Sequence, residues 1–208
     1  MPPANIAILA SGSGSNAEAL MDHFGRQASD VGRVVWVCSN RREAGVLERA
    51  ERWGIPHSHM AKADMMAGRL LEAFRARDVH WVALAGFLLK VPADVCHTFE
   101  GRMLNIHPAL LPNHGGAGMY GMHVHRAVKA AGDAVSGMTI HWVNERYDEG
   151  DIVFQGEVDL TSDDSPETIA AKVLALEHRH YPKVLEGLIR LAQGSLVRDG
   201  SHLKSLKP

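Results

Sequence analysis

An amide and an imidazole lie two residues apart in the segment Leu104-Asn105-Ile106-His107-Pro108. If Met103–Ile106 is a strand, the two-residue period of its side chains places Asn105 and His107 on the same side. An Asn side chain can donate a hydrogen bond to a developing oxyanion, and a His can carry a proton near neutral pH. The alternative is an ordinary strand end with a capping Asn and a surface His. The choice between a functional site and such a strand end depends on the rest of the chain.

A carboxylate that could serve this pair, Asp148, lies in the polar loop Asn144–Asp151. A carboxylate close to a His favours the imidazolium and raises the pKa of the ring. No Ser or Cys stands in a nucleophile elbow of the form G-x-S-x-G. The set therefore suits direct attack by a substrate amine on a carbonyl carbon, through a tetrahedral intermediate and without a covalent enzyme adduct. Asp148 could instead be a turn residue of its Asp-Glu-Gly sequence.

A Gly/Ser turn, Ser11–Asn16, follows the apolar run Ile6–Ala10 and precedes the helical segment Ala17–Phe24. In a turn between a strand and a helix, backbone N–H groups and the helix dipole can receive a phosphate. No Lys follows the glycines as in a Walker loop, and Ala17 occupies the last Gly position of the dinucleotide fingerprint. The turn therefore favours a phosphate monoester, with a simple turn as the alternative.

Short apolar runs alternate with helical segments along the first half of the chain. The predicted strands are Ile6–Ala10, Val34–Cys38, Ile55–Met60, Trp81–Ala85 and Met103–Ile106, and the predicted helices are Ala17–Phe24, Ala44–Trp53, Lys62–Arg77 and Pro92 to about Phe99. This order predicts an α/β fold of one domain, residues 1–208, with a Rossmann-like, doubly wound, mostly parallel sheet and flanking helices. The carboxyl ends of such strands meet at one crevice, so the Gly/Ser turn and Asn105 should face each other.

The second half of the chain is predicted to complete this domain. The expected elements are a mobile Gly-rich loop at Asn113–Gly121, a helix at His123–Ala131, strands at Met138–Val143 and Ile152–Val158, and a helix from Ser165 to about Gln193. Pro182 should kink or interrupt the last helix. From Gly194 the chain is expected to form one more strand or a loosely held end. The Gly-rich loop could be a lid or a simple linker.

Composition excludes several classes of protein. The chain has 208 residues, 46% of them apolar, and a formal net charge of −2, which gives no basic footprint for nucleic acid. Cys38 and Cys96 form no C-x-x-C pair, as expected of a reduced cytosolic protein. Neither a signal peptide nor a membrane-spanning segment is predicted. The 13 histidines come without a Cys pair or an H-E-x-x-H motif, so no metal site is expected. We expect a cytoplasmic monomer or homodimer acting on small molecules.

Four segments, in order, resemble the folate-dependent formyltransferase family. They are Gly12–Asn16, Leu84–Phe87, Asn105–Pro112 and Asp148–Val153, and the resemblance extends from about Asn5 to Leu191. The N-x-H-P-x-L-L-P segment is the most specific of them. The resemblance implies transfer of a formyl group from the co-substrate 10-formyltetrahydrofolate to the amine of glycinamide ribonucleotide, in purine biosynthesis. The alternatives are another amine acceptor, such as an amino sugar nucleotide, and a nucleotide-binding module without turnover.

The resemblance also implies roles for individual residues. Asn105 and His107 would stabilise the tetrahedral intermediate, and Asp148 would hold His107 and help to move a proton from the attacking amine to the folate nitrogen. The residues implied to bind glycinamide ribonucleotide are Gly14, Ser15, Asn16, Gly86, Pro108 and Glu177, with the phosphate at Gly14–Asn16 and the ribose hydroxyls at Glu177. The residues implied to bind folate are Leu88, Leu89, Lys90, Val91, Asn105, Asn144, Glu145, Arg146, Tyr147 and Asp148.

The chain departs from the family pattern at three places. Relatives often carry an Arg just after the Leu-Ala-Gly-Phe segment, where this chain has Leu88 and Leu89 before Lys90. A Lys found near the phosphate in some relatives would fall on Leu174. The loop Gly115–Gly121 is longer than the shortest family versions.

His141 is left as either a core residue of its strand or a site residue.

Overall fold

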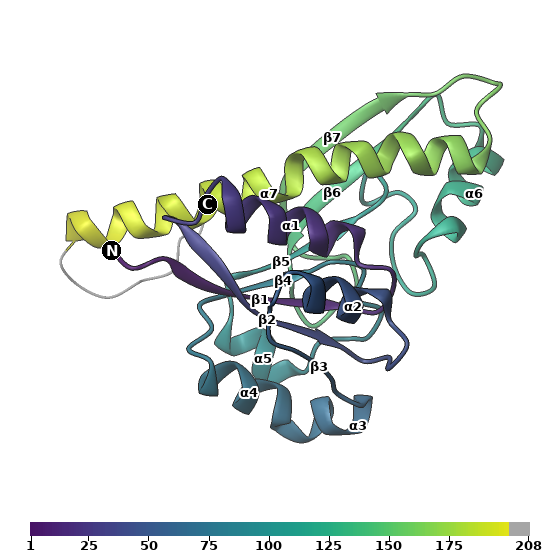
Figure 1. Ribbon diagram of the computed structural model, residues 1–208. Helices are drawn as coiled ribbons and strands as arrows, with labels where there is room; N and C mark the ends of the chain where they lie inside the picture. The colour runs from purple at the N-terminus through teal and green to yellow at the C-terminus, as the bar shows by residue number, and fades with distance from the viewer. Residues whose placement is uncertain (200–208) are drawn as a thin grey trace.

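The computed structural model describes residues 1–199 and builds them around one seven-stranded sheet, in the order β3-β2-β1-β4-β5-β6-β7 (Figure 1). The strands are β1 (Ala4–Ala10), β2 (Gly32–Ser39), β3 (His57–His59), β4 (Trp81–Leu84), β5 (Met103–His107), β6 (Val135–Trp142) and β7 (Ile152–Asp159). Neighbours from β3 to β5 pair in parallel, whereas β6 runs antiparallel to both β5 and β7. The predicted mostly parallel α/β fold and its seven strands are confirmed.

Helices cover both faces of this sheet (Figure 1). They are α1 (Ser15–Arg26), α2 (Gly45–Arg52), α3 (Lys62–Asp64), the π-helical turn η1 (Met65–Arg69), α4 (Leu70–Ala76), α5 (Ala93–Thr98), α6 (Met122–Ala131) and α7 (Pro166–Asp199). Helices α1, α2, α6 and α7 share one apolar core, and η1, α4 and α5 share the other. Successive residues of β1 alternate between the two, with Ile6 and Ile8 in the first core and Ala7 and Leu9 in the second.

The helix predicted over Lys62–Arg77 is not continuous. Gly68 adopts a left-handed conformation with φ of 86°, within the wider π-helical turn. Glycine reaches this region without the steric penalty of a β-carbon, which lets the helix change phase there. As a result Met65 is buried at 1% exposure, while Met66, which the helical spacing of Met66, Leu70 and Phe74 would place in the core, is 44% exposed.

Helix α7 begins at Pro166, next to the predicted capping Ser165, and continues past the predicted end to Asp199. The remainder of the predicted C-terminal strand or loose end lies outside the described residues. Pro182 removes one backbone hydrogen bond but does not interrupt the helix. The reason is tertiary packing. The buried Tyr181 hydroxyl lies 3.0 Å from the carbonyl oxygen of Leu84 and 3.1 Å from that of Leu104, which fastens this part of α7 to β4 and β5.

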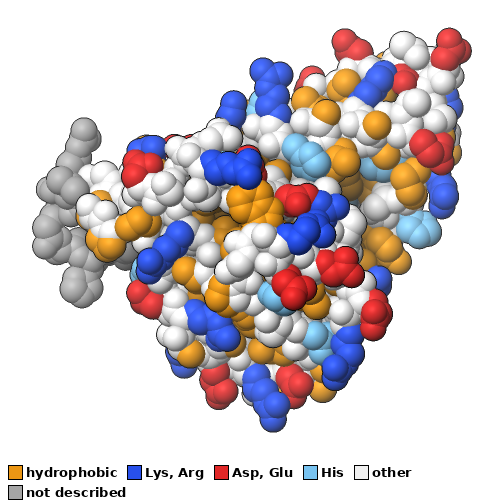
Figure 2. Space-filling view, viewed as in Figure 1, with side chains coloured by type: hydrophobic (Ala, Val, Ile, Leu, Met, Phe, Trp, Pro, Cys, Tyr) orange, Lys and Arg blue, Asp and Glu red, His pale blue; other side chains and the backbone are white. Residues whose placement is uncertain are grey.

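Charge and thiol chemistry add little to the site. Cys38 and Cys96 are buried free thiols, and burial raises the pKa of Cys38 to about 12 and that of Cys96 to about 11. Basic and acidic side chains are interspersed on the face shown in Figure 2.

Within residues 1–199 no helix is long and apolar enough to cross a bilayer. The same residues contain no group of His, Cys, Asp and Glu arranged to hold a metal ion.

Candidate active site

Asn105 and His107 lie at the carboxyl end of β5, between β4 and β6. In the antiparallel pairing with β6, Asn105 stands opposite His141 and His107 opposite Thr139. Pro108 follows directly, and the strand ends at His107. The predicted strand is therefore present, and both side chains reach the same carboxylate, that of Asp148.

The Asp148 carboxylate is the centre of this cluster. Its Oδ2 accepts a hydrogen bond from the Gly116 backbone N–H at 2.9 Å and lies 3.5 Å from Nδ1 of His107. Its Oδ1 lies 3.4 Å from Nδ2 of Asn105 and 3.6 Å from Nε2 of His141. Burial acts to raise the pKa of Asp148, but the His141 and His107 rings, which attract the carboxylate when they are protonated, and the Gly116 N–H outweigh burial and hold the pKa below its usual range. Asp148 is thus charged at neutral pH.

The ring of His107 has a defined tautomer. Its Nε2 lies 2.8 Å from the carbonyl oxygen of His114, which can only accept, so Nε2 carries a hydrogen. In the neutral ring Nδ1 is then unprotonated and faces the Asp148 carboxylate. Burial lowers the pKa of His107, although Asp148 and the His114 carbonyl oppose it. The raised pKa predicted for His107 from the nearby carboxylate alone is wrong. His107 is 3% exposed, and the loss of solvation on burial outweighs the effect of the carboxylate.

His141 belongs to the site, which resolves the alternative left open by the sequence. Its Nδ1 lies 2.8 Å from the carbonyl oxygen of Trp142, so the neutral ring carries its hydrogen there and presents Nε2 as an acceptor. Nδ2 of Asn105 donates to this Nε2 at 3.1 Å. His141 therefore fixes the orientation of the Asn105 amide and leaves the weaker N–H contact, 3.4 Å from Asp148, free to be exchanged.

The loop that carries Asp148 is held down by a close approach at Gly150. A β-carbon there would overlap the carbonyl oxygen of Trp142. The backbone N–H of Trp142 donates to the carbonyl of Asp151 at 3.0 Å, which closes the loop against β6. Asp148 itself has a φ of 55°, a conformation that is unusual for a residue with a side chain. The loop geometry thus delivers the carboxylate to the end of β5.

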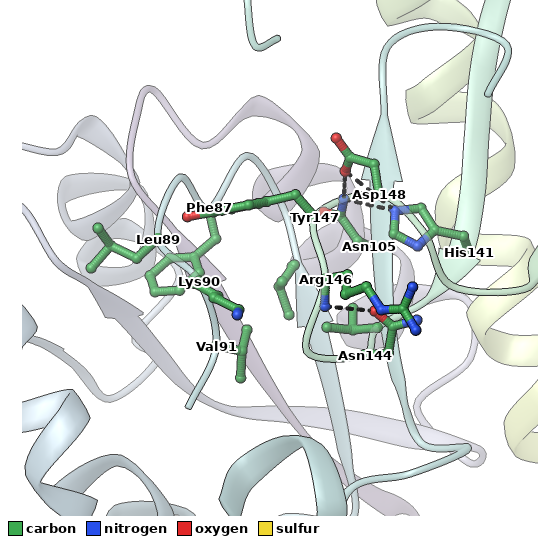
Figure 3. A pocket seen from close by; sticks show the side chains of 12 residues that line it. Phe87, Leu89, Lys90, Val91, Asn105, His141, Asn144, Arg146, Tyr147 and Asp148 are labelled. Atoms are coloured by element: carbon green, nitrogen blue, oxygen red, sulfur yellow. Dashed lines mark hydrogen bonds and ion pairs between the residues drawn. The ribbon is translucent and has the colours of Figure 1, made fainter. Parts of the chain in front are cut away.

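A pocket opens beside Asn105 and Asp148, between the segment after β4 and the Asp148 loop (Figure 3). Of the residues predicted to bind folate, those that line it are Leu89, Lys90, Val91, Asn105, Asn144, Arg146, Tyr147 and Asp148. Leu88 and Glu145 do not. The backbone N–H of Leu88 donates to the Ser11 hydroxyl at 2.9 Å, and the exposed Glu145 lies 3.6 Å from His97. The lining also includes Leu84, Phe87 and Val143, which the sequence analysis missed, and His141, which it left open. The alternation along β6 was the signal available for His141.

The predicted phosphate turn lies at the carboxyl end of β1, on the same edge of the sheet. Gly14 has a φ of 80° and packs so closely on Val46 that a side chain would not fit. Ser15 is the first residue of α1, and Nδ2 of Asn16 donates to Oε2 of Glu177 at 2.7 Å. Glu177 is buried, which raises its pKa to about 7 even though the Asn16 bond acts to lower it. Glu177 is therefore a buried acid and does not lie on the solvated face of α7.

Gly86 and Pro108 lie at the ends of the two strands between these groups. Gly86 follows β4 with a φ of 73°, and its carbonyl accepts from the Ser11 N–H at 3.0 Å, which joins the strand end to the Gly/Ser turn. Pro108 follows His107 directly. The structure thus brings together Asn105, His107 and Asp148, and separately Asn16 and Glu177, at one edge of the sheet.

The chain belongs to the formyl transferase family, whose pattern matches residues 4–185. It is 40% identical over 187 residues to the chloroplastic phosphoribosylglycinamide formyltransferase of Arabidopsis thaliana, with 86% of this chain and 63% of the relative covered. The chain thus spans about three-fifths of the length of the curated plant relatives that it matches.

Solved structures agree. Glycinamide ribonucleotide transformylase 1 from Symbiobacterium toebii is 35% identical, with a TM-score of 0.83 over 91% of this chain and 89% of that chain. Phosphoribosylglycinamide formyltransferase from Brucella melitensis is 33% identical, with a TM-score of 0.80 over 98% of this chain and 100% of that chain. The fold predicted from the sequence and the family resemblance are both confirmed.

Proposed function

We propose that the protein transfers the formyl group of 10-formyltetrahydrofolate to the amine of glycinamide ribonucleotide. The observation that carries this proposal is the cluster of Asn105, His107 and Asp148 at the strand edge that also bears the turn Gly14–Asn16. An uncharged donor, a proton carrier and a charged carboxylate are the groups that amine attack on a formyl carbon requires. The similarity to a phosphoribosylglycinamide formyltransferase and to a glycinamide ribonucleotide transformylase supports the same acceptor.

On the acceptor side, the turn Gly14–Asn16 would bind the phosphate. Gly14 precedes α1, so the backbone N–H groups of Ser15 and Asn16 belong to the first turn of a helix, where the dipole favours an anion. Glu177 would accept from the ribose hydroxyls, with Asn16 keeping the carboxylate in place. Gly86 and Pro108 would line the path between phosphate and amine.

The amine would then attack the formyl carbon next to Asn105 and His107. As the new C–N bond forms, the carbonyl oxygen becomes negative. The Asn105 N–H that faces Asp148 at 3.4 Å is weakly held and can turn to donate to this oxygen. His141 keeps the other N–H, so the amide stays in place during the step.

The proton of the attacking amine would pass to Nδ1 of His107. This atom is unprotonated in the neutral ring, and Asp148 beside it stabilises the imidazolium that forms. The proton would next move to the folate nitrogen, whose bond to the formyl carbon breaks, giving the formylated amine and tetrahydrofolate. Because His107 is neutral and Asp148 is charged before the reaction, the pair can take up one proton and release it again.

The folate would occupy the pocket beside Asn105. The backbone of Leu89–Val91 on one wall and of Asn144–Asp148 on the other offers hydrogen bonds to a pterin, and Phe87 and Val143 offer apolar surface. Lys90 is the cation on the wall where relatives often carry an Arg. Leu88 and Glu145 lie outside the lining and would contribute at most through their backbones.

The test is a formyl-transfer assay on the purified protein with 10-formyltetrahydrofolate and two acceptors, glycinamide ribonucleotide and an amino sugar nucleotide. We expect tetrahydrofolate to form with the first acceptor and at least tenfold more slowly with the second. Asn105→Ala and His107→Ala should lose most of the rate while keeping the circular dichroism of the wild type. Preference for the sugar nucleotide would overturn the choice of acceptor. Absence of product with either acceptor would overturn the proposal that the protein is a formyltransferase.

A further inference from the structure

The segment His114–Gly116 touches both members of the His107–Asp148 pair. The carbonyl oxygen of His114 accepts from Nε2 of His107 at 2.8 Å, and the N–H of Gly116 donates to Oδ2 of Asp148 at 2.9 Å. The first contact sets which nitrogen of His107 carries the hydrogen, and the second orients the carboxylate. A shift of this segment would therefore disturb two groups of the site at once.

The segment His114–Gly116 lies in neither a helix nor a strand. Its φ values are 53° at His114 and 93° at Gly116, and Gly118 and Gly121 further along the loop also have positive φ values. A left-handed conformation costs free energy for a residue with a side chain, so a side-chain contact that stabilises His114 helps to keep the segment in this conformation.

The side chain of His114 provides that contact. Its Nε2 lies 2.7 Å from Oδ2 of Asp133. Asp133 follows Gly132, the left-handed C-cap of α6, and its N–H lies 3.4 Å from the carbonyl of Val128. The carboxylate is therefore fixed to a helix end, and it ties the loop to that helix. Within residues 1–199 the Asp133 carboxylate bonds to His114 and forms no hydrogen bond or ion pair with His107 or Asp148.

Many ion pairs at a protein surface contribute little, so a His–Asp contact alone would mean nothing. This pair differs because the residue whose ring is held is the one whose carbonyl binds His107. Both side chains are partly screened from water, with 19% of the His114 side chain and 37% of the Asp133 side chain exposed. The contact between His114 and Asp133 therefore acts on His107 through the backbone carbonyl of His114.

We propose that Asp133 and the side chain of His114 form a positioning pair that fixes the tautomer and placement of His107 for proton transfer. Asp133 acts through the His114 carbonyl and touches neither substrate nor reacting atoms. The pair is expected to affect the rate of the chemical step and not the binding of substrates. The proposal rests on the proposed function for its kinetic readout, but its spectroscopic readout needs no substrate.

The kinetic test compares Asp133→Asn and His114→Phe with a matched control. His23 and Glu186, between α1 and α7, form another His–carboxylate contact of 2.7 Å, so Glu186→Gln removes the same kind of pair elsewhere. We expect kcat to fall roughly tenfold in both test variants, as for a catalytic group displaced by a fraction of an ångström. KM for both substrates should stay within about twofold. Glu186→Gln should leave kcat unchanged.

The second readout is the ring nitrogens of His107, observed by ¹⁵N NMR. The wild type should show the Nε2-protonated tautomer, and Asp133→Asn should show a mixture of tautomers or an altered pKa. Unchanged His107 signals together with a wild-type kcat would overturn the proposal, as would an equal loss of kcat in Glu186→Gln. If the protein transfers no formyl group, the NMR comparison alone decides. If Asp133→Asn does not fold, His114→Phe, which keeps the carbonyl, carries the test.

Discussion

The proposed site has a catalytic half, formed by Asn105, His107, His141 and Asp148, and a nucleotide half, formed by the turn Gly14–Asn16 and Glu177. The two halves differ in how completely their polar groups are hydrogen-bonded. In the catalytic half, each of Asn105, His107, His141 and Asp148 has a partner within the site. In the nucleotide half, Asn16 Oδ1 is buried and has no hydrogen-bond partner among residues 1–199. Buried polar atoms without partners are uncommon in folded proteins and call for an explanation.

Protonation shows the same contrast. Asp148 is stabilised in its charged form by three neighbours, whereas Glu177 has its pKa raised to about 7 by burial, with Asn16 as its one stabilising partner. The catalytic half is therefore assembled before substrate arrives, as electrostatic catalysis requires. The nucleotide half retains a buried acceptor, Asn16 Oδ1, to which a hydroxyl group of a ligand can donate. We infer that changes in the first half affect kcat and changes in the second affect KM.

The largest effect is expected from Asp148→Asn. The amide cannot stabilise the His107 imidazolium, and it weakens the contacts with Asn105 and the Gly116 N–H. We expect kcat to fall about a thousandfold, in line with losing both proton transfer and electrostatic support. Steady-state kinetics measure this, with Asp78→Asn as a control because Asp78 pairs with His80 at the surface. A kcat within tenfold of the wild type would refute the role given to Asp148.

The next effect concerns stability and Glu177. Its pKa in the folded protein is about 7, above the ordinary 4.5, so folding favours the protonated form. The stabilisation is complete below pH 4.5 and is lost as the pH rises through 7, by up to about 3 kcal/mol. Glu177→Gln should abolish this loss and become more stable than the wild type at pH 8. Urea unfolding at pH 5, 6.5 and 8 measures the difference, and a pH-independent difference would contradict the buried acid.

Glu186→Gln serves as the control for that experiment. The pKa of Glu186 is lowered in the folded protein, because Arg190 and His23 outweigh partial burial. Its contribution therefore has the opposite sign, present above its ordinary pKa and lost as the pH falls. Over pH 5 to 8 Glu186 is charged in both the folded and the unfolded protein, so the stability difference between Glu186→Gln and the wild type should stay constant, whereas that of Glu177→Gln should grow as the pH rises.

A smaller loss is expected from Gly150→Ala. The added β-carbon would meet the carbonyl oxygen of Trp142 and push the Asp148 loop away from β5. We expect roughly a thirtyfold fall in kcat with an intact fold, since displacement by about an ångström can cost as much as a hundredfold. Gly187→Ala is the matched control, because nothing lies within 4 Å of its β-carbon position in α7. Equal activity of the two variants would show that the loop is not held in this way.

The smallest effect is expected from Asn16→Ala. It removes the bond to Glu177 and one side-chain group near the turn, but it keeps the backbone N–H groups of positions 15 and 16. We expect KM for glycinamide ribonucleotide to rise about tenfold, the cost of one charge-assisted hydrogen bond, with kcat little changed. A fall in kcat without a change in KM would break the division between the two halves.

Much of the fold follows from local sequence. Short apolar runs between helical segments gave all seven strands, and Pro108 marked the end of β5. Gly54, which follows α2, has a φ of 64°, and its N–H donates to the Glu51 carbonyl. These features depend on residues that are neighbours in sequence. The change of helix phase at Gly68 was missed, because packing against the sheet decides which of Met65 and Met66 is buried.

The site divides in the same way. Asn105, His107 and Asp148 could be found from residue type and family resemblance. The contacts that tune them could not, because they come from backbone groups: the His114 carbonyl, the Gly116 N–H and the Trp142 carbonyl. Residue type alone does not predict where these backbone groups will lie. The direction of the His107 pKa shift was missed for a related reason, since burial is a property of the whole fold.

The most direct measurement places Asp148→Asn and Asn16→Ala side by side in one steady-state experiment with glycinamide ribonucleotide as the varied substrate. We expect Asp148→Asn to lose kcat about a thousandfold with KM within about threefold, and Asn16→Ala to raise KM about tenfold with kcat within about threefold. If both variants lost the same parameter, the division into a preassembled catalytic half and a ligand-completed nucleotide half would be wrong.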